Sequence, residues 1–436
     1  MKKWQLHWAA MGIALFIAGC GGGGGGNSGI NNNPGRGGLV QSPPPQWISL
    51  TAADYSNKLS TAGASGQTLL QLATGSPTGT LACGVDVYYL RYGTEGGKGE
   101  STQASAAVMV PTGTGPKCSG PRPVVLHAHG TAVERRYNLA DFVDPSNPAQ
   151  GEQALLASQY AASGYIVVAP NYAGYDSSTL AYHPFLVADQ QSKDMIDALT
   201  AARSALPGMS TAVSDNGKLF LTGISQGGHV AMATVRAMRA LNMTVTASAP
   251  IEPVSSLLRY GDAIISGQVP AGSTTLMPML INGYQKTYGT IYSAPTDYYT
   301  ASYAAGIESA FPGSYTSDTL ATSGVVPALL LFSGGASATP APFAPLFSQF
   351  VGPGNLITDS ARGSYVADIT NTPPTNNNLR KALNTNDVVS MTVDKPMMLC
   401  GGAQDPTVFF YVNADYFAAT HAGNPYLRIL DLENSY

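Results

Sequence analysis

A serine lies at the centre of the pentapeptide Gly223-Ile-Ser-Gln-Gly227, and its surroundings suit a nucleophile. The apolar run that ends at Thr222 predicts a buried strand, and residues 228–241 predict a helix. The glycines permit a sharp turn between them without a Cβ clash, which leaves the hydroxyl of Ser225 exposed at the strand tip. The helix that follows points its first amides at a developing oxyanion. We interpret Ser225 as a nucleophile; the alternative is a glycine-rich turn in which the serine has no role.

Two histidines, His127 and His129, end a second apolar run and are followed by Gly130-Thr131. Two imidazoles at this spacing can be mistaken for a metal-binding pair, but no third ligand is spaced to join them. We expect them to shape a loop beside Ser225. The sequence gives no reason to expect a metal or another cofactor.

The elements that must position these groups alternate along the chain. The patterns predict antiparallel strands over 85–92 and 104–110, and buried strands over 123–130, 165–170, 218–222, 245–250, 396–402 and 426–432. Helices are predicted over 152–163, stopped by Gly164, and over 186–206, stopped by Pro207-Gly208. Strands that alternate with helices predict the α/β class, with a mostly parallel, doubly wound sheet whose sites lie at the carboxyl ends of the strands.

The alternation lapses between Val254 and Lys395. We expect a large insertion over about residues 255–394, before the penultimate strand, which includes an apolar run at 325–332 and a proline-rich run at 338–350. An insertion at the strand tips forms a cap over the site; the alternative is a side lobe with no part in it. A cap this poor in charge would line an apolar acyl pocket.

The N-terminus predicts export. Lys2 and Lys3 precede an apolar stretch over 8–18 that is too short to span a bilayer as a mature helix. It ends in Ile17-Ala-Gly-Cys20, which resembles a bacterial lipobox, so residues 1–20 are expected to be a lipoprotein signal peptide and Cys20 to be lipidated. The alternative is an ordinary signal peptide with a chance cysteine. Gly21 resembles lipoproteins of the outer membrane of Gram-negative bacteria, and residues 21–45 are expected to be a Gly/Pro/Asn-rich tether.

Residues 46–436 are long enough for one catalytic domain with an insertion. The net charge is −4, charged residues make up 11% of the chain, and no basic cluster occurs in the mature part, which argues against a nucleic-acid partner. Cys83 and Cys118 flank the two antiparallel strands and are expected to form a disulfide in an oxidising compartment. Cys400 is then left unpaired.

The stretches Val168-Ala-Pro-Asn-Tyr-Ala-Gly-Tyr, His183-Pro-Phe-Leu and Gly223-Ile-Ser-Gln-Gly-Gly-His together resemble the secretory-lipase and carboxylesterase group of the α/β-hydrolases. The superfamily resemblance extends from about Leu81 onward, and the narrower resemblance is confined to 164–254. It implies the α/β-hydrolase fold and ester hydrolysis through an acyl-enzyme.

The resemblance also implies roles for further residues. The backbone amides of Gln226 and Thr131 would form the oxyanion hole. Asp405 follows the penultimate strand and a glycine turn, and would orient the base; the alternative is an aspartate that caps a helix beginning near Thr407. Glu252 is the reserve candidate for the acid.

The catalytic base departs from the family pattern. The family places its histidine after the last strand, but only 433–436 follow Leu432 here, without a histidine. His421 is the fallback, although it lies at the end of a predicted helix, where histidines commonly cap. His229 is expected to pack within its helix. The unassigned base and the unpaired Cys400 both favour a domain cut short at its C-terminus.

Three functions fit the sequence. A serine carboxylesterase or lipase that acts on small-molecule or lipid esters leads. A serine peptidase of the same fold would need a subsite for a charged peptide terminus, and no Arg or Glu pair is evident. A non-catalytic binding lipoprotein of the envelope is favoured if no base histidine exists.

Overall fold

The computed structural model describes residues 29–333, 335–336 and 354–434. Its strands are β1 (Gly29–Ile30), β2 (Gln41–Ser42), β3 (Gln46–Leu50), β4 (Gly84–Glu95), β5 (Ser101–Thr112), β6 (Gly120–Ala128), β7 (Ile166–Pro170), β8 (Val213–Ile224), β9 (Ala247–Ile251), β10 (Leu330–Phe332), β11 (Gly335–Ala336), β12 (Met397–Gly401) and β13 (Leu427–Asp431). Its α-helices are α1 (Ala52–Thr61), α2 (Gly63–Thr74), α3 (Gln150–Gln159), α4 (Ala188–Met209), α5 (Gln226–Ala240), α6 (Leu257–Ser266), α7 (Ser273–Tyr288), α8 (Pro295–Tyr298), α9 (Ala301–Ala304), α10 (Ser317–Thr322), α12 (Asp359–Val366), α13 (Asn378–Asn386) and α14 (Phe410–Thr420). Two 3₁₀ turns, η1 (Ala161–Ser163) and η2 (Ile307–Ser309), complete the set.

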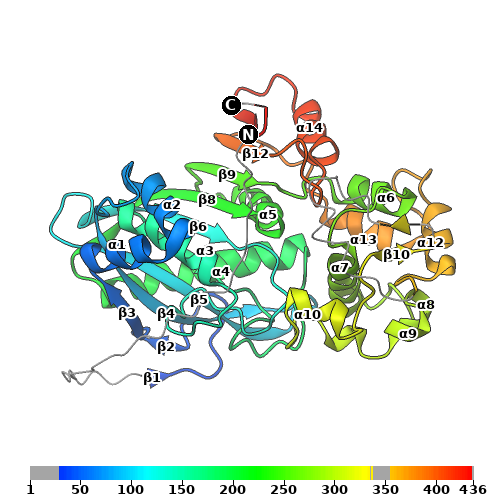
Figure 1. Cartoon of the computed structure of the whole chain (residues 1–436), viewed down its shortest axis with the longest axis horizontal. Coiled ribbons are helices and arrows are strands. Elements are labelled where there is room, and N and C mark those ends of the chain that lie inside the picture. The colour runs from blue at the N-terminus through cyan, green and yellow to red at the C-terminus, as the bar shows by residue number, and fades with distance from the viewer. Residues whose placement is uncertain (1–28, 334, 337–353, 435–436) are drawn as a thin grey trace.

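Nine strands form one mixed sheet in the order β13-β12-β9-β8-β6-β7-β5-β4-β3 (Figure 1). The six strands from β13 to β7 run parallel, and β5, β4 and β3 join antiparallel at one side. β7 and the second half of β6 are buried and mainly apolar, because both faces of the sheet are covered there. The predicted α/β class with a mostly parallel sheet is confirmed.

Helices cover both faces of the sheet. His127 of β6 is hydrogen-bonded to Glu152 of α3, whereas Val124 of the same strand lines a small cavity with Leu199 of α4. Residues three apart on a strand point to opposite faces, so α3 and α4 pack on opposite sides of the sheet. The helix α5 packs beside α4 and against β8 and β9, directly after the predicted nucleophile.

Two local expectations differ from the structure. The helix α4 continues through Pro207 to Met209, so the proline lies in the last turn of the helix and does not end it. Residues 31–45 pack against the domain, whereas their composition predicts a tether without core contacts. Val40 is 1% exposed and Arg36 forms ion pairs with Asp197 and Glu95. The lipobox with Cys20 and the proline-rich run at 338–350 lie outside the described residues.

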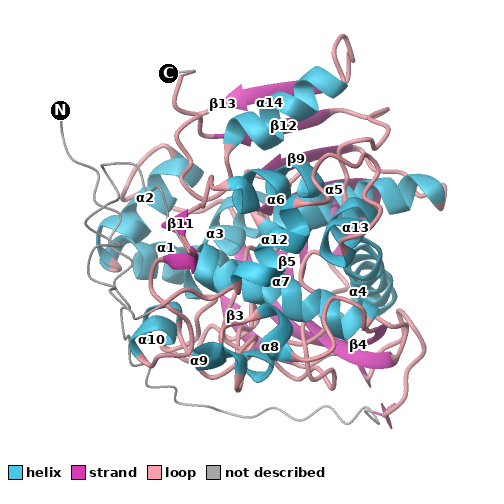
Figure 2. Ribbon diagram, turned by 90° about the vertical axis from the view of Figure 1, so that its right-hand side faces the viewer, coloured by secondary structure: helices cyan, strands magenta, loops and turns pink. Residues whose placement is uncertain are grey.

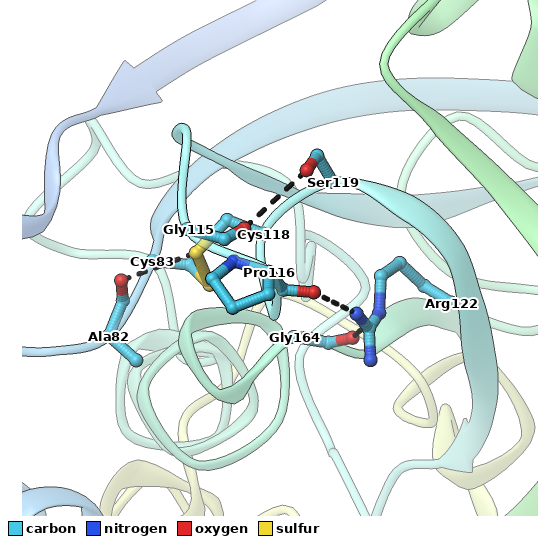
Figure 3. Close-up of a disulfide and its surroundings, with 8 residues drawn as sticks. All are labelled: Ala82, Cys83, Gly115, Pro116, Cys118, Ser119, Arg122 and Gly164. Atoms are coloured by element: carbon cyan, nitrogen blue, oxygen red, sulfur yellow. Dashed lines mark hydrogen bonds between the residues drawn. A yellow bond between two sulfur atoms is a disulfide. The ribbon is translucent and has the colours of Figure 1, made fainter.

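Cys83 and Cys118 form a disulfide with their Cα atoms 5.4 Å apart, as predicted (Figure 3). Cys83 directly precedes β4, and Cys118 follows β5 in the turn that leads into β6. Arg122 holds this turn by donating to the carbonyl oxygens of Pro116 and Gly164. The bond therefore ties together both ends of the β4–β5 hairpin. Cys400 is free and buried.

The residues between β9 and β12 form a helical lobe beside the sheet, which we call the cap (Figure 1). It has its own hydrophobic core, with Tyr284, Tyr299 and Tyr365 each 0% exposed, separate from the core around the sheet. Figure 2 looks onto this lobe, with strands of the sheet behind it. The cap meets the sheet at the carboxyl end of β8, where Ser225 lies.

Candidate active site

Ser225 occupies a strained turn between β8 and α5. Its φ of 57° and ψ of −116° lie in a region that non-glycine residues seldom adopt, and the surrounding structure must hold it there. The amide of Ser225 donates to the carbonyl oxygen of Ile251 at 2.9 Å. A Cβ at Gly227 would lie 2.0 Å from the carbonyl oxygen of Ala128, so only glycine lets the elbow approach β6 this closely.

Ser225 opens into a cavity between the sheet and the cap. Thr131 and Gln226 also line it, so three of the residues predicted for the site face one space. The rest of the wall comes chiefly from α6, α7 and α13 of the cap and is almost entirely apolar, with Leu280 and Leu383 among its residues. The cavity therefore suits an apolar group placed beside the serine.

A partly buried carboxylate holds the loop that carries Thr131. Glu152 Oε1 lies 2.7 Å from His127 Nε2 and accepts a 3.3 Å hydrogen bond from the amide of Gly130. Its other oxygen accepts from the hydroxyl of Tyr137 at 2.5 Å. Burial disfavours the ionised carboxylate, but the hydrogen bond and charge of His127 outweigh burial and lower the pKa of Glu152 to about 2. These contacts of Glu152 therefore fix the position of the loop that carries Thr131.

His129 is buried in the same loop and is packed as a core residue. Its ring stacks on Tyr137 at 4.4 Å and on Tyr172 at 4.1 Å, measured between ring centroids. Its two nitrogens lie near the carbonyl oxygens of Gly130 and Asn171. Both loop histidines are therefore occupied by structural contacts. Across the described ranges no three His, Cys, Asp or Glu side chains are grouped to hold a metal.

Asp405 follows β12 and uses one oxygen to cap a turn. Its Oδ1 accepts from the amides of Thr407 at 2.6 Å and Val408 at 2.9 Å. The helix itself begins only at Phe410, so this capping does not exclude a second role for Asp405. Glu252 lies beside it and accepts a hydrogen bond from the amide of Gly402. Burial, reinforced by the charge of Asp405, raises the pKa of Glu252 to about 8.

The structure does not make His421 the base. As expected for a helix end, it is the C-cap of α14, and its ring nitrogens lie 2.8 Å from the carbonyl oxygen of Met391 and 3.0 Å from that of Phe417. His229 is buried on α5 and donates through Nδ1 to the carbonyl oxygen of Val254. Within the part of the chain that the structure describes, no histidine is hydrogen-bonded to Ser225 Oγ.

The sequence pattern did not reveal the residues whose hydrogen bonds hold the active-site segments in place. Glu152 and Tyr137 brace the Thr131 loop, and His183 contacts the side chain of Gln226. Their contacts join distant segments, so no local spacing reveals them. The one signal in the sequence that could point to such a residue is His183. This histidine begins an otherwise apolar run and is part of the family resemblance, although the resemblance gives it no role.

No protein-family model and no curated protein matches the chain. The rice cell wall degrading esterase LipA from Xanthomonas oryzae matches with a TM-score of 0.72 and 26% identity, over 92% of each chain. A putative hydrolase from Legionella pneumophila matches at 0.68 and 17%, over 90% of this chain and 91% of that one. Candida antarctica lipase A matches at 0.52 and 13%, over 80% and 72%.

The chain has the α/β-hydrolase fold. The strand order, the elbow at Ser225 and the match over nearly the whole length of LipA agree on this point. Structural likeness to an esterase at 26% identity also supports the broader expectation of an esterase type of protein, whereas the likeness to lipase A supports the fold alone. None of the helices in the described ranges is long and apolar enough to cross a membrane.

Proposed function

We propose that this protein is a serine carboxylesterase or lipase that hydrolyses carboxylic esters through an acyl-enzyme on Ser225. The observation that carries the proposal is the strained Ser225 turn, which opens into an apolar cavity together with Gln226 and Thr131. Strain of this kind persists only where the fold enforces it, and it gathers at functional sites. The 26% identity to an esterase over 92% of each chain supports the same reading.

Each residue receives a role in this scheme. Ser225 attacks the ester carbonyl, and the resulting oxyanion is stabilised by the backbone amides of Gln226 and Thr131. The serine hydroxyl is too weakly acidic to attack alone, so a base must take its proton. Asp405 is proposed to orient that base and to stabilise its charge. The base itself is not assigned to any described residue.

The cap supports an ester with an apolar acyl group as the substrate. The cavity beside Ser225 is lined by Leu257, Ile264 and Leu280 among others, and it offers almost no polar partner to a charged or sugar-like group. Burial of each methylene group in such a wall contributes about 0.8 kcal/mol. The acyl chain is therefore proposed to lie under the cap.

A non-catalytic ligand-binding protein is the second candidate. Its supporting observation is that, in the described residues, no side chain is hydrogen-bonded to Ser225 Oγ, while the apolar cavity is fully formed. A protein of this kind would bind an acyl group in the cavity without cleaving an ester.

The deciding experiment combines covalent labelling with hydrolysis. The wild-type protein is treated with a fluorophosphonate and assayed with p-nitrophenyl esters of two to sixteen acyl carbons. Ser225→Ala should abolish both signals, whereas Ser323→Ala, at an exposed serine of the cap, should change neither.

Labelling of a serine other than Ser225 would overturn the assignment. Absence of both labelling and hydrolysis in a folded wild-type protein would favour the binding function instead.

We further propose that the protein is exported and lipid-anchored at the outer membrane through Cys20. The lipobox-like Ile17–Cys20 segment motivates this, and the Cys83–Cys118 disulfide supports an oxidising compartment. Metabolic labelling with a palmitate analogue should mark the wild type and not Cys20→Ser. Equal labelling of both would contradict the anchor.

A further inference from the structure

His183 is enclosed behind the nucleophile turn, with 3% of its surface exposed. Its Nδ1 lies 2.8 Å from the carbonyl oxygen of Ala173. A carbonyl oxygen only accepts hydrogen bonds, so Nδ1 carries the proton. Burial lowers the pKa of His183 to about 3, and the ring is therefore neutral at physiological pH. A neutral ring protonated at Nδ1 presents an unshared electron pair at Nε2.

The free electron pair of His183 is directed at Gln226. The distance from His183 Nε2 to Gln226 Nε2 is 2.7 Å, and Gln191 Nε2 lies 3.4 Å from the same His183 atom. Amide nitrogens donate, so Gln226 donates to the imidazole. The Oε1 atoms of Gln226 and Gln191 have no partner in the described residues, so the contact with His183 is the polar contact that fixes the Gln226 side chain.

Gln226 matters because of its backbone. It is the first residue of α5, it directly follows Ser225, and its amide is the proposed oxyanion donor. The elbow is already held on its other side by the close approach of Gly227 to Ala128. A side chain anchored to His183 would restrain the first turn of α5, and with it the backbone amide of Gln226.

We propose that His183 is a positioning residue, a neutral hydrogen-bond acceptor that fixes Gln226 and thereby the oxyanion-stabilising amide beside Ser225. This inference rests on the proposed ester hydrolysis at Ser225. His183 does not touch the reacting atoms in this scheme. Ala173 sets its tautomer, and the tautomer sets the orientation of Gln226.

Two substitutions of His183 separate its hydrogen bond to Ala173 from the one that it accepts from Gln226. In His183→Gln the amide oxygen can take the place of Nε2 and accept from Gln226, whereas in His183→Asn the shorter amide can keep only the donor to Ala173. We expect His183→Asn to lower kcat about 10- to 100-fold, below the 10²- to 10³-fold cost of removing an oxyanion donor outright. KM should change less than about twofold, since the amide acts on the transition state. His183→Gln should remain within about threefold of wild type.

Tyr182→Phe is the matched control. This variant changes the residue next to His183 in the chain and removes a hydroxyl that is hydrogen-bonded to Glu100 and Gly97. It should leave kcat unchanged. Equal kcat in wild type and both His183 variants would overturn the proposal. So would an equal loss in His183→Gln and His183→Asn, or a loss confined to KM, because each outcome points to packing rather than to the acceptor.

A spectroscopic measurement tests His183 without any turnover. In protein labelled with ¹⁵N-histidine, the His183 ring should show a protonated Nδ1 and an unprotonated Nε2 from pH 5 to pH 9. A ring protonated at Nε2 at pH 7 would overturn the proposal. If the wild type neither hydrolyses esters nor reacts with fluorophosphonate, the proposed function fails, and the ring signal still decides whether His183 is the acceptor of Gln226.

Discussion

At the scale of single residues, Glu252 shows how a carboxyl group is held beside the strand tips. It has a φ of 44°, and its carboxyl group lies over the backbone of Gly401, where a Cβ would be only 2.6 Å from Oε2. Burial, and after it the charge of Asp405, raises the pKa of Glu252, so this carboxyl group keeps its proton to a higher pH than a free glutamic acid does.

The raised pKa of Glu252 predicts that the stability of the protein depends on pH. The pKa of Glu252 rises from 4.5 to about 8 in the folded state, so between these values the folded protein keeps a proton that the unfolded chain releases. The contribution of Glu252 is therefore complete below pH 4.5 and is lost as the pH rises through 8. In Glu252→Gln the side chain is neutral at every pH, can still accept from Gly402 and can donate to Asp405. Its unfolding free energy should fall less than that of wild type between pH 5 and pH 9.

Urea unfolding at pH 5, 7 and 9 measures this difference. Asp189→Asn, at a side chain that is 77% exposed, serves as the control and should follow the wild-type curve. Parallel curves for wild type and Glu252→Gln would show that Glu252 does not hold the proton.

At the scale of elements, the nucleophile turn depends on glycine for a steric reason. The Cβ of an alanine at 227 would lie 2.0 Å from a backbone oxygen of the neighbouring strand, which cannot move independently. Gly227→Ala should therefore displace Ser225 from Thr131, lower the unfolding free energy and abolish fluorophosphonate labelling. Gly363 lies inside α12, where an added methyl group would meet no atom within 4 Å. Gly363→Ala should stabilise the protein by about 0.5–1 kcal/mol.

Thermal unfolding should show a loss of stability in Gly227→Ala and a gain in Gly363→Ala, although both variants replace glycine by alanine. Fluorophosphonate labelling tests the loss of Ser225 reactivity expected in Gly227→Ala. Normal labelling of Gly227→Ala would mean that the elbow adapts without moving the serine.

Elements with a strong local pattern could be predicted from the sequence. The buried parts of β6, β7 and β8 carry short apolar runs, and the turn around Ser225 combines glycines with a strand and a helix. Within the cap, the helices α8 to α10 have four to six residues, too few to show a helical period. Residues 31–45 have no periodic pattern, and they are held by long-range contacts such as that of Arg36 with Asp197.

The residues of the site also fall into two groups, those that could be predicted from the sequence and those that could not. Ser225 can be identified from its neighbours in the chain. Glu152 and His183 act across 22 or more positions, on Gly130 and Gln226, and only the folded chain brings them together. The base could not be assigned from sequence, and the described residues place His421 against Met391 and Phe417.

At the scale of the whole molecule, the disulfide constrains the antiparallel side of the sheet. It closes a loop across 35 positions, and in the chain-entropy model a loop of this length stabilises the folded state by about 4 kcal/mol. Cys83→Ser with Cys118→Ser should therefore lower the unfolding free energy by about 2–5 kcal/mol, measured by urea unfolding. Cys400→Ser is the control for losing a thiol, and added reductant should affect the wild type but not the double variant. An unchanged unfolding midpoint would contradict the role of this bond.

The cap and the sheet have separate hydrophobic cores, and the cavity beside Ser225 lies where they meet. If the acyl chain lies under the cap, filling the cavity from the cap side should shorten the accepted chain without disturbing the serine. Leu280 on α7 lines the cavity. Leu280→Trp should lower kcat/KM for p-nitrophenyl esters of eight or more carbons at least about tenfold, while acetate hydrolysis and fluorophosphonate labelling stay within about twofold.

Val366 is 43% exposed at the end of α12, and Val366→Trp tests the effect of a new indole away from the cavity. It should leave the chain-length profile unchanged. A uniform loss across all esters in Leu280→Trp would instead indicate that the cap couples to the elbow itself. An unchanged profile would place the acyl chain outside the cap, because an indole cannot share this space with a long chain in a close-packed interior.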